Sequence, residues 1–528
     1  MSTQTLPDPA AALAVVRDYH QRTKHRFAAY AHGPGTLDWD AQPAPFRHFD
    51  GAEQIALPRL AALAPGSALH AALQRPFAAL DEPQPPLPVD LASIGALLQL
   101  SLGLTAWKSY GPDRWALRAN PSSGNLHPTE AYLLLGGVKG LADGLYHYRS
   151  ENHALELRAS HATTGGSPRL AVLLTSVMWR EAWKYGERAF RYCQLDLGHV
   201  LAAVSYAATL LGWRAQLLRL DSPEVADCLG LDRETDFAGV EAEEPEVIVA
   251  LETDASPPCG WTGWAGTPGL LDPRPLYQWP VIDDVAAATR GALPSAAARP
   301  PQPAPLPSTS IRPATEVILH RRSAQAFDGR SVLPHAVFRR LLACLLPGGA
   351  PVWNVWPHAP RVHPLLLVHR VEGVPPGLYA LPRSDAAAAA LREAPRAEFA
   401  WEAADPDLPL YRLLQATATR TARTLSCHQD IASHGAVTFM LLAEFAAPIA
   451  ENPAAYRHLH WEAGMLGHVV TLEAEAAGWR GTGIGCFFDD ADHDVLGLTD
   501  NRFQVLYHFA VGMPVDDPRL LTLPAYDE

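Results

Sequence analysis

The sequence predicts an α+β protein built from two tandem domains, each a mixed, mainly antiparallel sheet flanked by helices. Three observations predict it. Helical and strand-like hydrophobic patterns follow one another along the chain. Residues 294–313 hold seven prolines and form a stiff linker. Motifs before this linker recur in the same order after it. We expect an N-terminal domain at 1–285, a linker at 286–313 and a C-terminal domain at 314–528.

The charge, apolar runs and cysteines of the chain limit the partners and the compartment that we expect. The chain has 528 residues, 42 Lys plus Arg against 56 Asp plus Glu, and a formal net charge of −14. This balance argues against nucleic acid or an anionic membrane surface as the main partner. The N-terminus lacks the pattern of a signal peptide, and no run reaches the ~20 apolar residues of a membrane span. Six scattered cysteines without a CxxC pair indicate reduced thiols, so we expect a cytoplasmic protein.

The first half should alternate helices with strands around one buried sheet. After a Pro- and Gly-rich wrap, a short Trp-rich loop is expected to lead into the polar turn at 121–125. The expected segments are a helix at 11–29, an irregular wrap at 33–88, a helix at 91–104, a strand at 131–135, its hairpin partner at 144–148, a short strand or helix start at 171–177, a long helix at 188–211 and a strand at 246–251. After the linker, a second helix is expected to begin at Glu316 and to carry Arg321, Arg322 and Ser323.

The two sides of the linker repeat each other. Residues 21–27 align with residues 321–327 without a gap. The interval from Arg191 to Gly212 equals that from Arg457 to Gly478, and a Gly-Trp-Arg triplet begins at both glycines. Such ordered matches predict a tandem duplication of one domain.

The turn Pro121-Ser122-Ser123-Gly124-Asn125 carries groups that suit a polar, planar ligand. Proline ends the preceding element, glycine permits close backbone approach, and the asparagine amide both donates and accepts hydrogen bonds. The alternative is a helix cap before a strand. The corresponding place in the second half reads Trp356-Pro357-His358 and lacks these groups.

The second half carries an arginine motif and a glycine-rich segment that the first half lacks. It carries Arg321-Arg322-Ser323 and a glycine-rich segment at 481–486, where the first half has Gln21-Arg22-Thr23 and a glycine-free segment at 215–218. Two arginines beside a serine on a helix suit a phosphate, which accepts bidentate charge-assisted bonds. If the halves pack as a pseudo-dimer, one composite site survives between them and its two-fold mate has decayed.

These motifs resemble those of the FMN-binding nitroreductase superfamily, and the tandem arrangement is similar to SagB-type dehydrogenases, relatives of the thiazoline/oxazoline dehydrogenases. In that family the flavin lies at a dimer interface, so the resemblance implies two nitroreductase-like domains forming an intrachain pseudo-dimer around one FMN. It implies phosphate contacts from Arg321, Arg322 and Ser323, isoalloxazine contacts from Pro121, Ser122, Ser123 and Asn125, backbone N–H groups from Gly483, Ile484 and Gly485, a pyrimidine contact from Gln429, and Arg519 as the late basic residue on the phosphate.

Lys184 and Tyr185 resemble the Lys-Tyr element of the azoline dehydrogenases, where the pair serves as base and proton relay. A lysine is a poor base at neutral pH unless burial or a nearby cation lowers its pKa from about 10.4. Arg188 and Arg191 are expected to supply that cation. The alternative is a surface lysine and a core tyrosine.

The leading function is an FMN-dependent dehydrogenase or oxidase of a small heterocyclic, amino-acid-derived or peptidyl substrate. The alternatives are an NAD(P)H-dependent nitro or quinone reductase, and a non-catalytic flavin-binding protein. The redox partner, NAD(P)H or oxygen, is left open by the sequence. No metal is expected, because Cys427, His428 and His434 form no tetrahedral set. Cys486 is interpreted as a small buried filler.

Overall fold

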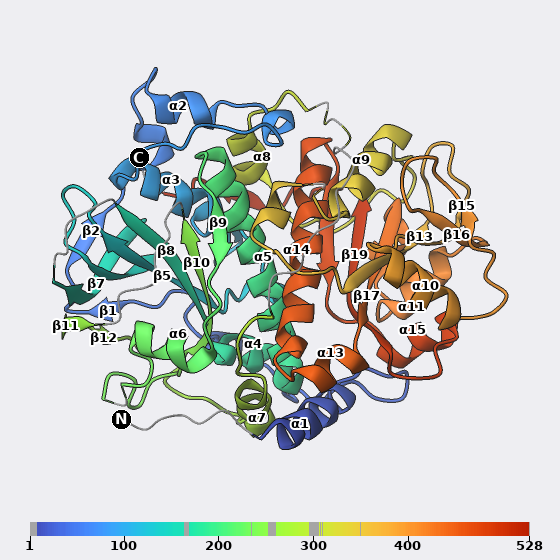
Figure 1. The fold of residues 1–528 in the computed structure, drawn as a ribbon, viewed down its shortest axis with the longest axis horizontal. Coiled ribbons are helices and arrows are strands. Elements are labelled where there is room, and N and C mark those ends of the chain that lie inside the picture. Colours follow the sequence, from blue (N-terminus) through green and yellow to red (C-terminus); the bar gives the residue numbers. More distant parts are fainter. Residues whose placement is uncertain are drawn as a thin grey trace.

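The computed structural model describes residues 8–162, 168–233, 235–251, 260–294, 306, 308, 310–348 and 350–526. Two antiparallel sheets stand on either side of a central pair of long helices, α5 (Ala189–Leu210) and α14 (Ala455–Ala476), as Figure 1 shows. The predicted α+β class is confirmed.

Strand order is the same in both sheets. The first runs β11-β7-β6-β5-β8-β10-β9, with β2 beside β7, and the second runs β15-β16-β14-β13-β17-β19-β18. Their bounds are β2 Gln54–Ala56, β5 Thr129–Gly136, β6 Gly144–Arg149, β7 Ala154–His161, β8 Arg169–Ser176, β9 Ala215–Leu217, β10 Glu244–Leu251 and β11 Trp261–Trp264, then β13 Val362–Val368, β14 Gly377–Ala380, β15 Glu402–Ala403, β16 Tyr411–Gln415, β17 Val437–Glu444, β18 Arg480–Ile484 and β19 Phe503–Gly512. Two independent folds would not share this order, so the topology supports duplication.

The long helices cross at a pair of equivalent glycines. A methyl group added at Gly198 would collide with the Trp461 carbonyl oxygen and lie 2.9 Å from the Gly464 Cα. One added at Gly464 would collide with the Leu195 carbonyl oxygen. Glycine at both positions lets the helix backbones touch, and this contact sets the distance between the halves.

The remaining helices cover the sheets and the long-helix pair. They are α1 Pro9–Arg22, α2 Ala68–Leu73, α3 Leu91–Ser101, α4 Met178–Tyr185, α6 Ser222–Leu229, α7 Pro280–Ala288, α8 Ala314–His320, α9 His335–Leu345, α10 Asp385–Glu393, α11 Thr419–Leu425, α12 Asp430–His434, α13 Ala446–Glu451 and α15 Asp489–Leu496. One large apolar core runs through both halves. Within the described ranges, no helix has the length and apolarity to span a bilayer.

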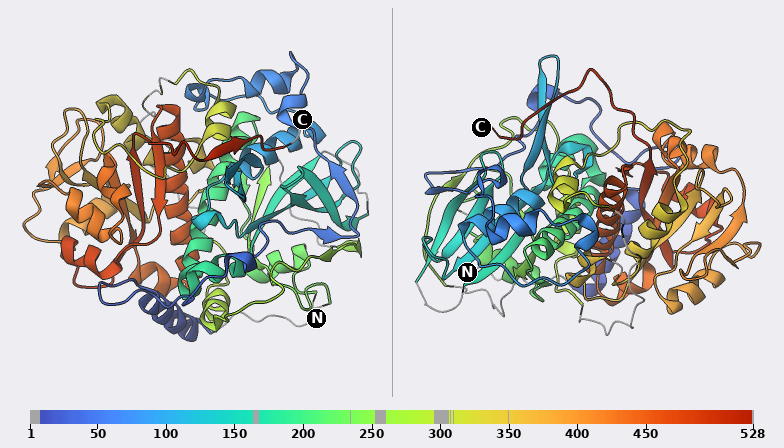
Figure 2. Two further views of the ribbon diagram at one scale, coloured as in Figure 1. Left: turned by 180° about the vertical axis from the view of Figure 1, so that it is seen from behind. Right: turned by 90° about the horizontal axis from the view of Figure 1, so that it is seen from above.

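Each half sends a terminal segment onto the other. The N-terminal α1 packs against α13 of the second half (Figure 1). The C-terminal strand β20 (Leu521–Leu523) crosses to the first half and pairs with β3 (Leu104–Tyr110), which pairs with β4 (Asp113–Arg118) (Figure 2). The prediction of a Trp-rich loop before the polar turn is therefore wrong. This segment is a hairpin, because a strand from the far end of the chain completes its sheet. A further two-stranded pair joins β1 (Phe49–Asp50) to β12 (Thr267–Pro268).

Two expected helices are shorter than predicted. The first ends at Arg22, because the backbone N–H of His25 donates to the Asp489 carboxylate at 2.9 Å and the chain turns toward α15. The second, α8, ends at His320, so the arginine motif follows a helix instead of lying on one. In the predicted linker, α7 extends to Ala288. Residues 295–305, 307 and 309 lie outside the described residues.

Candidate functional site

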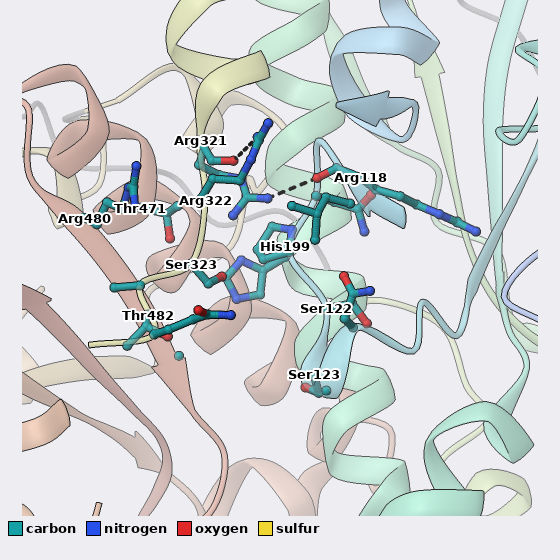
Figure 3. Close-up of a pocket in the computed structure, with 18 of the residues that line it drawn as sticks. Arg118, Ser122, Ser123, His199, Arg321, Arg322, Ser323, Thr471, Arg480 and Thr482 are labelled. Atoms are coloured by element: carbon teal, nitrogen blue, oxygen red, sulfur yellow. Dashed lines mark hydrogen bonds between the residues drawn. The ribbon is translucent and has the colours of Figure 1, made fainter. Parts of the chain in front are cut away.

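A cavity of about 870 Å³ opens between the two halves. Figure 3 shows Arg321, Arg322 and Ser323 of the second half on one side and Ser122 and Ser123 of the first half on the other. We call it the arginine cavity. Of the predicted site residues, those that line it are Pro121, Ser122, Ser123, Asn125, Tyr185, Arg321, Arg322, Ser323, Gln429, Gly483, Ile484 and Gly485.

One end of the arginine cavity holds buried positive charge. Arg321 is 3% exposed and donates to the carbonyls of Ala119 at 3.1 Å and Arg118 at 3.0 Å. Its Nη1 has no hydrogen-bond partner among the described residues. Arg322 donates to the Thr105 hydroxyl at 3.2 Å. Within the described ranges, neither arginine forms an ion pair with a carboxylate. Such uncompensated cations favour a bound anion.

Burial lowers the pKa of both Arg321 and Arg322. It lowers the pKa of Arg321 to about 9, and the charges of Arg322 and Arg480 add to the effect. The pKa of Arg322 is also lowered, first by burial. An anion placed here would relieve both desolvation and mutual repulsion.

Arg480, which the sequence reasoning did not select, is a basic residue near Arg321 and Arg322, and its side chain pairs with Asp516. It lies at the start of β18 and lines the cavity. The Arg519 prediction is wrong: that side chain pairs with Asp517 at 2.7 Å and lies over the Tyr110 ring, outside the cavity. The Gly-Trp-Arg triplet at 478–480 was the available signal for Arg480.

The polar turn is held by a carboxylate from α5. Asp196 accepts from the Ser122 hydroxyl at 2.5 Å, the Ser123 amide at 3.0 Å and the Ser123 hydroxyl at 2.9 Å. Burial raises the pKa of Asp196 to about 7, although these hydrogen bonds oppose it. Asn125 donates to the Ala116 carbonyl at 2.8 Å. The serine side chains therefore position the turn, while its surface lines the cavity.

The opposite wall comes from β18 and the segment before α12. Gly483 and Ile484 pair with β19, and their strand faces the cavity. Gln429 donates to the Cys486 carbonyl at 3.1 Å and to the Ser426 carbonyl at 3.0 Å. The amide side chain thus fixes this wall.

Lys184 and Tyr185 end α4 beside the polar turn. A methyl group on Gly124 would lie 2.5 Å from the Tyr185 hydroxyl and 3.1 Å from the Lys184 Nζ. Tyr185 lines the cavity, whereas Lys184 lies behind Gly124, with Nζ 5.4 Å from the centre of the Trp39 ring. Only glycine at this point, where φ is +57°, lets the pair approach the turn.

The Lys184 pKa is lowered, but by burial and not by arginines. The prediction that Arg188 and Arg191 lower the pKa of Lys184 is wrong, because both arginines pair with the buried Asp489, at 3.0 and 2.7 Å. Their charge is therefore neutralised by a carboxylate of the other half.

Glu181, missed by the sequence reasoning, is fully buried near Lys184. Neither carboxylate oxygen has a hydrogen-bond partner among the described residues. Burial raises its pKa well above the usual range, Asp196 raises it further, and Lys184 lowers it. The region next to the cavity therefore holds a lysine, a tyrosine and two carboxyls with raised pKa values, which is a set able to accept and pass protons.

A second cavity, of about 730 Å³, occupies the position related by the duplication. It is lined by Trp356 and His358, by Glu462 in the place of Asp196, and by Arg290 and Arg361. We call it the tryptophan cavity. Arg290 pairs with Glu244 at 2.8 Å and Arg361 with Glu444 at 2.5 Å. These two arginines are thus compensated, and Arg219, the third that lines this cavity, donates to the Leu293 carbonyl at 3.0 Å. Over the described residues, no group of three or more His, Cys, Asp or Glu side chains is arranged to hold a metal.

Comparisons with known proteins agree with this geometry. Residues 318–513 match the model of the nitroreductase family. The match to the family model therefore lies within the second half. A crystal structure from Anabaena variabilis, described as a nitroreductase, superposes with a TM-score of 0.68 at 22% identity, covering 95% of this chain and 99% of that chain. The nitroreductase-like fold thus extends over both halves, and the resemblance to the superfamily is confirmed.

Two curated relatives match part of the chain. The trifolitoxin-processing protein TfxB of Rhizobium leguminosarum is 31% identical over 149 residues, which are 24% of this chain and 39% of that protein. MJ1384 of Methanocaldococcus jannaschii, named as a nitroreductase, is 28% identical over 138 residues, which are 24% of this chain and 66% of that protein. The chain spans less than two thirds of either relative.

Proposed function

We propose that the arginine cavity binds one FMN. The fit rests on the buried Arg321 and the half-buried Arg322, which have no carboxylate partner in the described chain. They lie at one end of a cavity whose other walls are a polar turn and a glycine-rich strand. Arg321, Arg322, Ser323 and Arg480 would hold the phosphate. The turn and β18 would enclose the ring system, and FMN would supply a two-electron acceptor.

We further propose that the protein is an FMN-dependent dehydrogenase or oxidase of a small heterocyclic, amino-acid-derived or peptidyl substrate. The observation that carries this proposal is the placement of Lys184 and Tyr185 against Gly124, at the turn that lines the cavity. Burial keeps the lysine pKa below its usual value, which favours the neutral amine that accepts a proton. Tyr185 would pass that proton onward. The name of TfxB as a toxin-processing protein supports a peptidyl substrate. A cytoplasmic location stays a prediction.

The second candidate is an NAD(P)H-dependent nitro or quinone reductase. The family match favours it, since members named as nitroreductases resemble both halves. Such a reaction would not need a proton-accepting pair beside the cavity. A non-catalytic flavin-binding role is disfavoured by the open cavity and the buried titratable groups around Lys184.

The absorption spectrum of the purified protein separates these proposals. Visible flavin bands that persist after gel filtration are expected if the cavity binds FMN. Anaerobic addition of NADPH should leave the bands unchanged for the dehydrogenase and bleach them for the reductase. A colourless protein that takes up no FMN during reconstitution would contradict both.

A further inference from the structure

Two cysteines from separate segments meet at the edge of the arginine cavity. Cys427 follows α11 and Cys486 follows β18. The segments are joined on both sides of the thiols, because the Phe488 amide donates to the Leu425 carbonyl at 2.8 Å and Gln429 donates to the Cys486 carbonyl at 3.1 Å. Because the Gln429 amide contacts the carbonyls of both Ser426 and Cys486, at 3.0 and 3.1 Å, the two cysteines lie close together, and each thiol is the largest influence on the pKa of the other. Both are partly exposed, whereas Cys193, Cys228 and Cys344 are buried.

An imidazole from the first half faces Cys486. His25 Nδ1 accepts the Ala31 amide at 2.9 Å, so its proton lies on Nε2, and the ring is close enough to the Cys486 thiol for each to shift the pKa of the other. Asp489 fixes the His25 backbone by bonds in both directions, at 2.9 and 3.1 Å. The interpretation of Cys486 as a buried filler is therefore wrong, since it has polar partners and lines the cavity.

The surroundings distinguish the two thiols. The Cys427 thiol lowers the pKa of Cys486, and His25 and Arg188 lower it further against the effect of burial. The Cys486 thiol raises the pKa of Cys427, and burial and Asp489 add to the rise. Cys486 is thus the nucleophile of the pair.

Backbone conformation also marks this segment. Cys427 has φ +51° and His428 has φ +60°, so two consecutive non-glycine residues adopt the left-handed region. Such conformations are costly and persist where surrounding structure imposes them. The strained residues stand where the Cys427 segment meets the Cys486 segment, between the Leu425 and Gln429 contacts.

We propose that Cys427 and Cys486 form a dithiol site that low-molecular-weight disulfides oxidise to an intramolecular disulfide. The Cys486 thiolate attacks one sulfur of the external disulfide, forms a mixed disulfide and releases one thiolate. The Cys427 sulfur then attacks the Cys486 sulfur, closes the Cys427–Cys486 bond and releases the second thiolate. The released thiolates take up the two cysteine protons, so the protein dithiol is oxidised and the external disulfide is reduced.

This site goes beyond the proposed flavin reaction and does not depend on it. Cys486 follows Gly485, whose carbonyl accepts from Arg188 and Tyr192, both at 3.2 Å. Oxidation would therefore occur on the wall of the arginine cavity, next to residues of the first half.

The test uses the full-length protein and glutathione disulfide, followed by denaturing alkylation and peptide mapping. The expected product is a single cross-linked peptide joining Cys427 to Cys486. Cys427→Ser should instead trap glutathione on Cys486, and Cys486→Ser should leave Cys427 largely free. Cys193→Ala, at a buried cysteine, should behave as the parent. Absence of the cross-link in the parent, or glutathione retained on both cysteines, would overturn the proposal.

A second variant tests the role assigned to His25. His25→Asn should slow alkylation of Cys486 by iodoacetamide at pH 6, about tenfold for each unit by which the thiol pKa rises above the assay pH. Circular dichroism checks that the variant folds. An unchanged rate in a folded variant would contradict activation of Cys486 by this imidazole.

Discussion

The arginine and tryptophan cavities occupy equivalent places in a duplicated frame, yet their charges are balanced differently. In the arginine cavity, Arg321 reaches only carbonyl oxygens and leaves Nη1 unsatisfied among the described residues. In the tryptophan cavity, Arg290 pairs with Glu244, and Arg361 pairs with Glu444. Packing alone does not explain this difference, because the strand order and the helix crossing are shared. We propose that ligand binding follows this difference, so that the arginine cavity binds an anion and the tryptophan cavity does not.

The turn carboxylates show the same divergence. Asp196 accepts from Ser122 and Ser123, so it holds a polar turn against the cavity. Its counterpart Glu462 accepts the Arg361 amide at 3.0 Å and pairs with the buried Arg383. The first carboxylate organises a surface for a ligand, and the second stabilises the fold.

The largest expected effect comes from changing Lys184 and Tyr185, the proposed proton-accepting residues of the first half. Lys184→Ala and Tyr185→Phe should each slow substrate oxidation by about 10²–10⁴-fold, since this is the usual contribution of general acid–base groups. Flavin content should stay at the parent value. Single-turnover oxidation of substrate under anaerobic conditions measures the effect.

The matched control lies at the equivalent place of the second half. Glu451 lines the tryptophan cavity, and Glu451→Ala should oxidise substrate at the parent rate. Parent rates in both Lys184→Ala and Tyr185→Phe would remove these residues from the chemistry and favour the reductase.

Sequence alone could predict that the polar turn and the arginine motif come from opposite halves. The duplication is readable along the chain, and complementary losses in the two copies indicate one composite site. It could not predict that Arg321 would hold the first half's backbone, or that Asp489 would neutralise Arg188 and Arg191. Those contacts join residues whose spacing in the chain carries no pattern.

Two further features could not be predicted, because residues distant in the chain produce them. The β3–β4 hairpin was missed because β20, from the far end of the chain, completes its sheet. Glu181 was missed because a single glutamate in a helix predicts a solvated side chain, and only the packing around α4 buries it.

The next effect concerns the phosphate end. Arg322→Ala should weaken FMN binding by about 10- to 150-fold, because charge-assisted hydrogen bonds contribute ~1.5–3 kcal/mol. Arg321→Ala should weaken it at least as much, and should also lower the melting temperature, since two bonds to the first half are lost. Fluorescence titration with FMN measures the affinity.

Gln21→Ala provides the comparison, because Gln21 occupies the place of Arg321 in the first half. Its FMN affinity should equal that of the parent. Equal weakening by Gln21→Ala and Arg321→Ala would contradict the assignment of the phosphate end to the second half.

The smallest effect is a pH dependence of the turn. Burial raises the pKa of Asp196 to about 7, so its carboxylate takes up a proton as the pH falls through that value. Ser122 and Ser123 then lose an anionic acceptor, and FMN affinity should decrease a few-fold from pH 8 to pH 6. In Asp196→Asn the affinity should be the same at both values. A parent affinity that does not change over this range would show that Asp196 keeps one protonation state.

Flavin stoichiometry tests the central comparison most directly. Within the described residues, only the arginine cavity combines the polar turn with a buried arginine that lacks a carboxylate partner, so each chain should bind one FMN. Denaturing release of the flavin, with its absorbance measured against protein concentration from amino-acid analysis, gives the ratio after reconstitution with excess FMN. A ratio of one per chain that falls toward zero in the Arg321→Ala, Arg322→Ala double variant is the predicted result. A ratio of two per chain would contradict the account, because the tryptophan cavity would then bind flavin despite its paired charges.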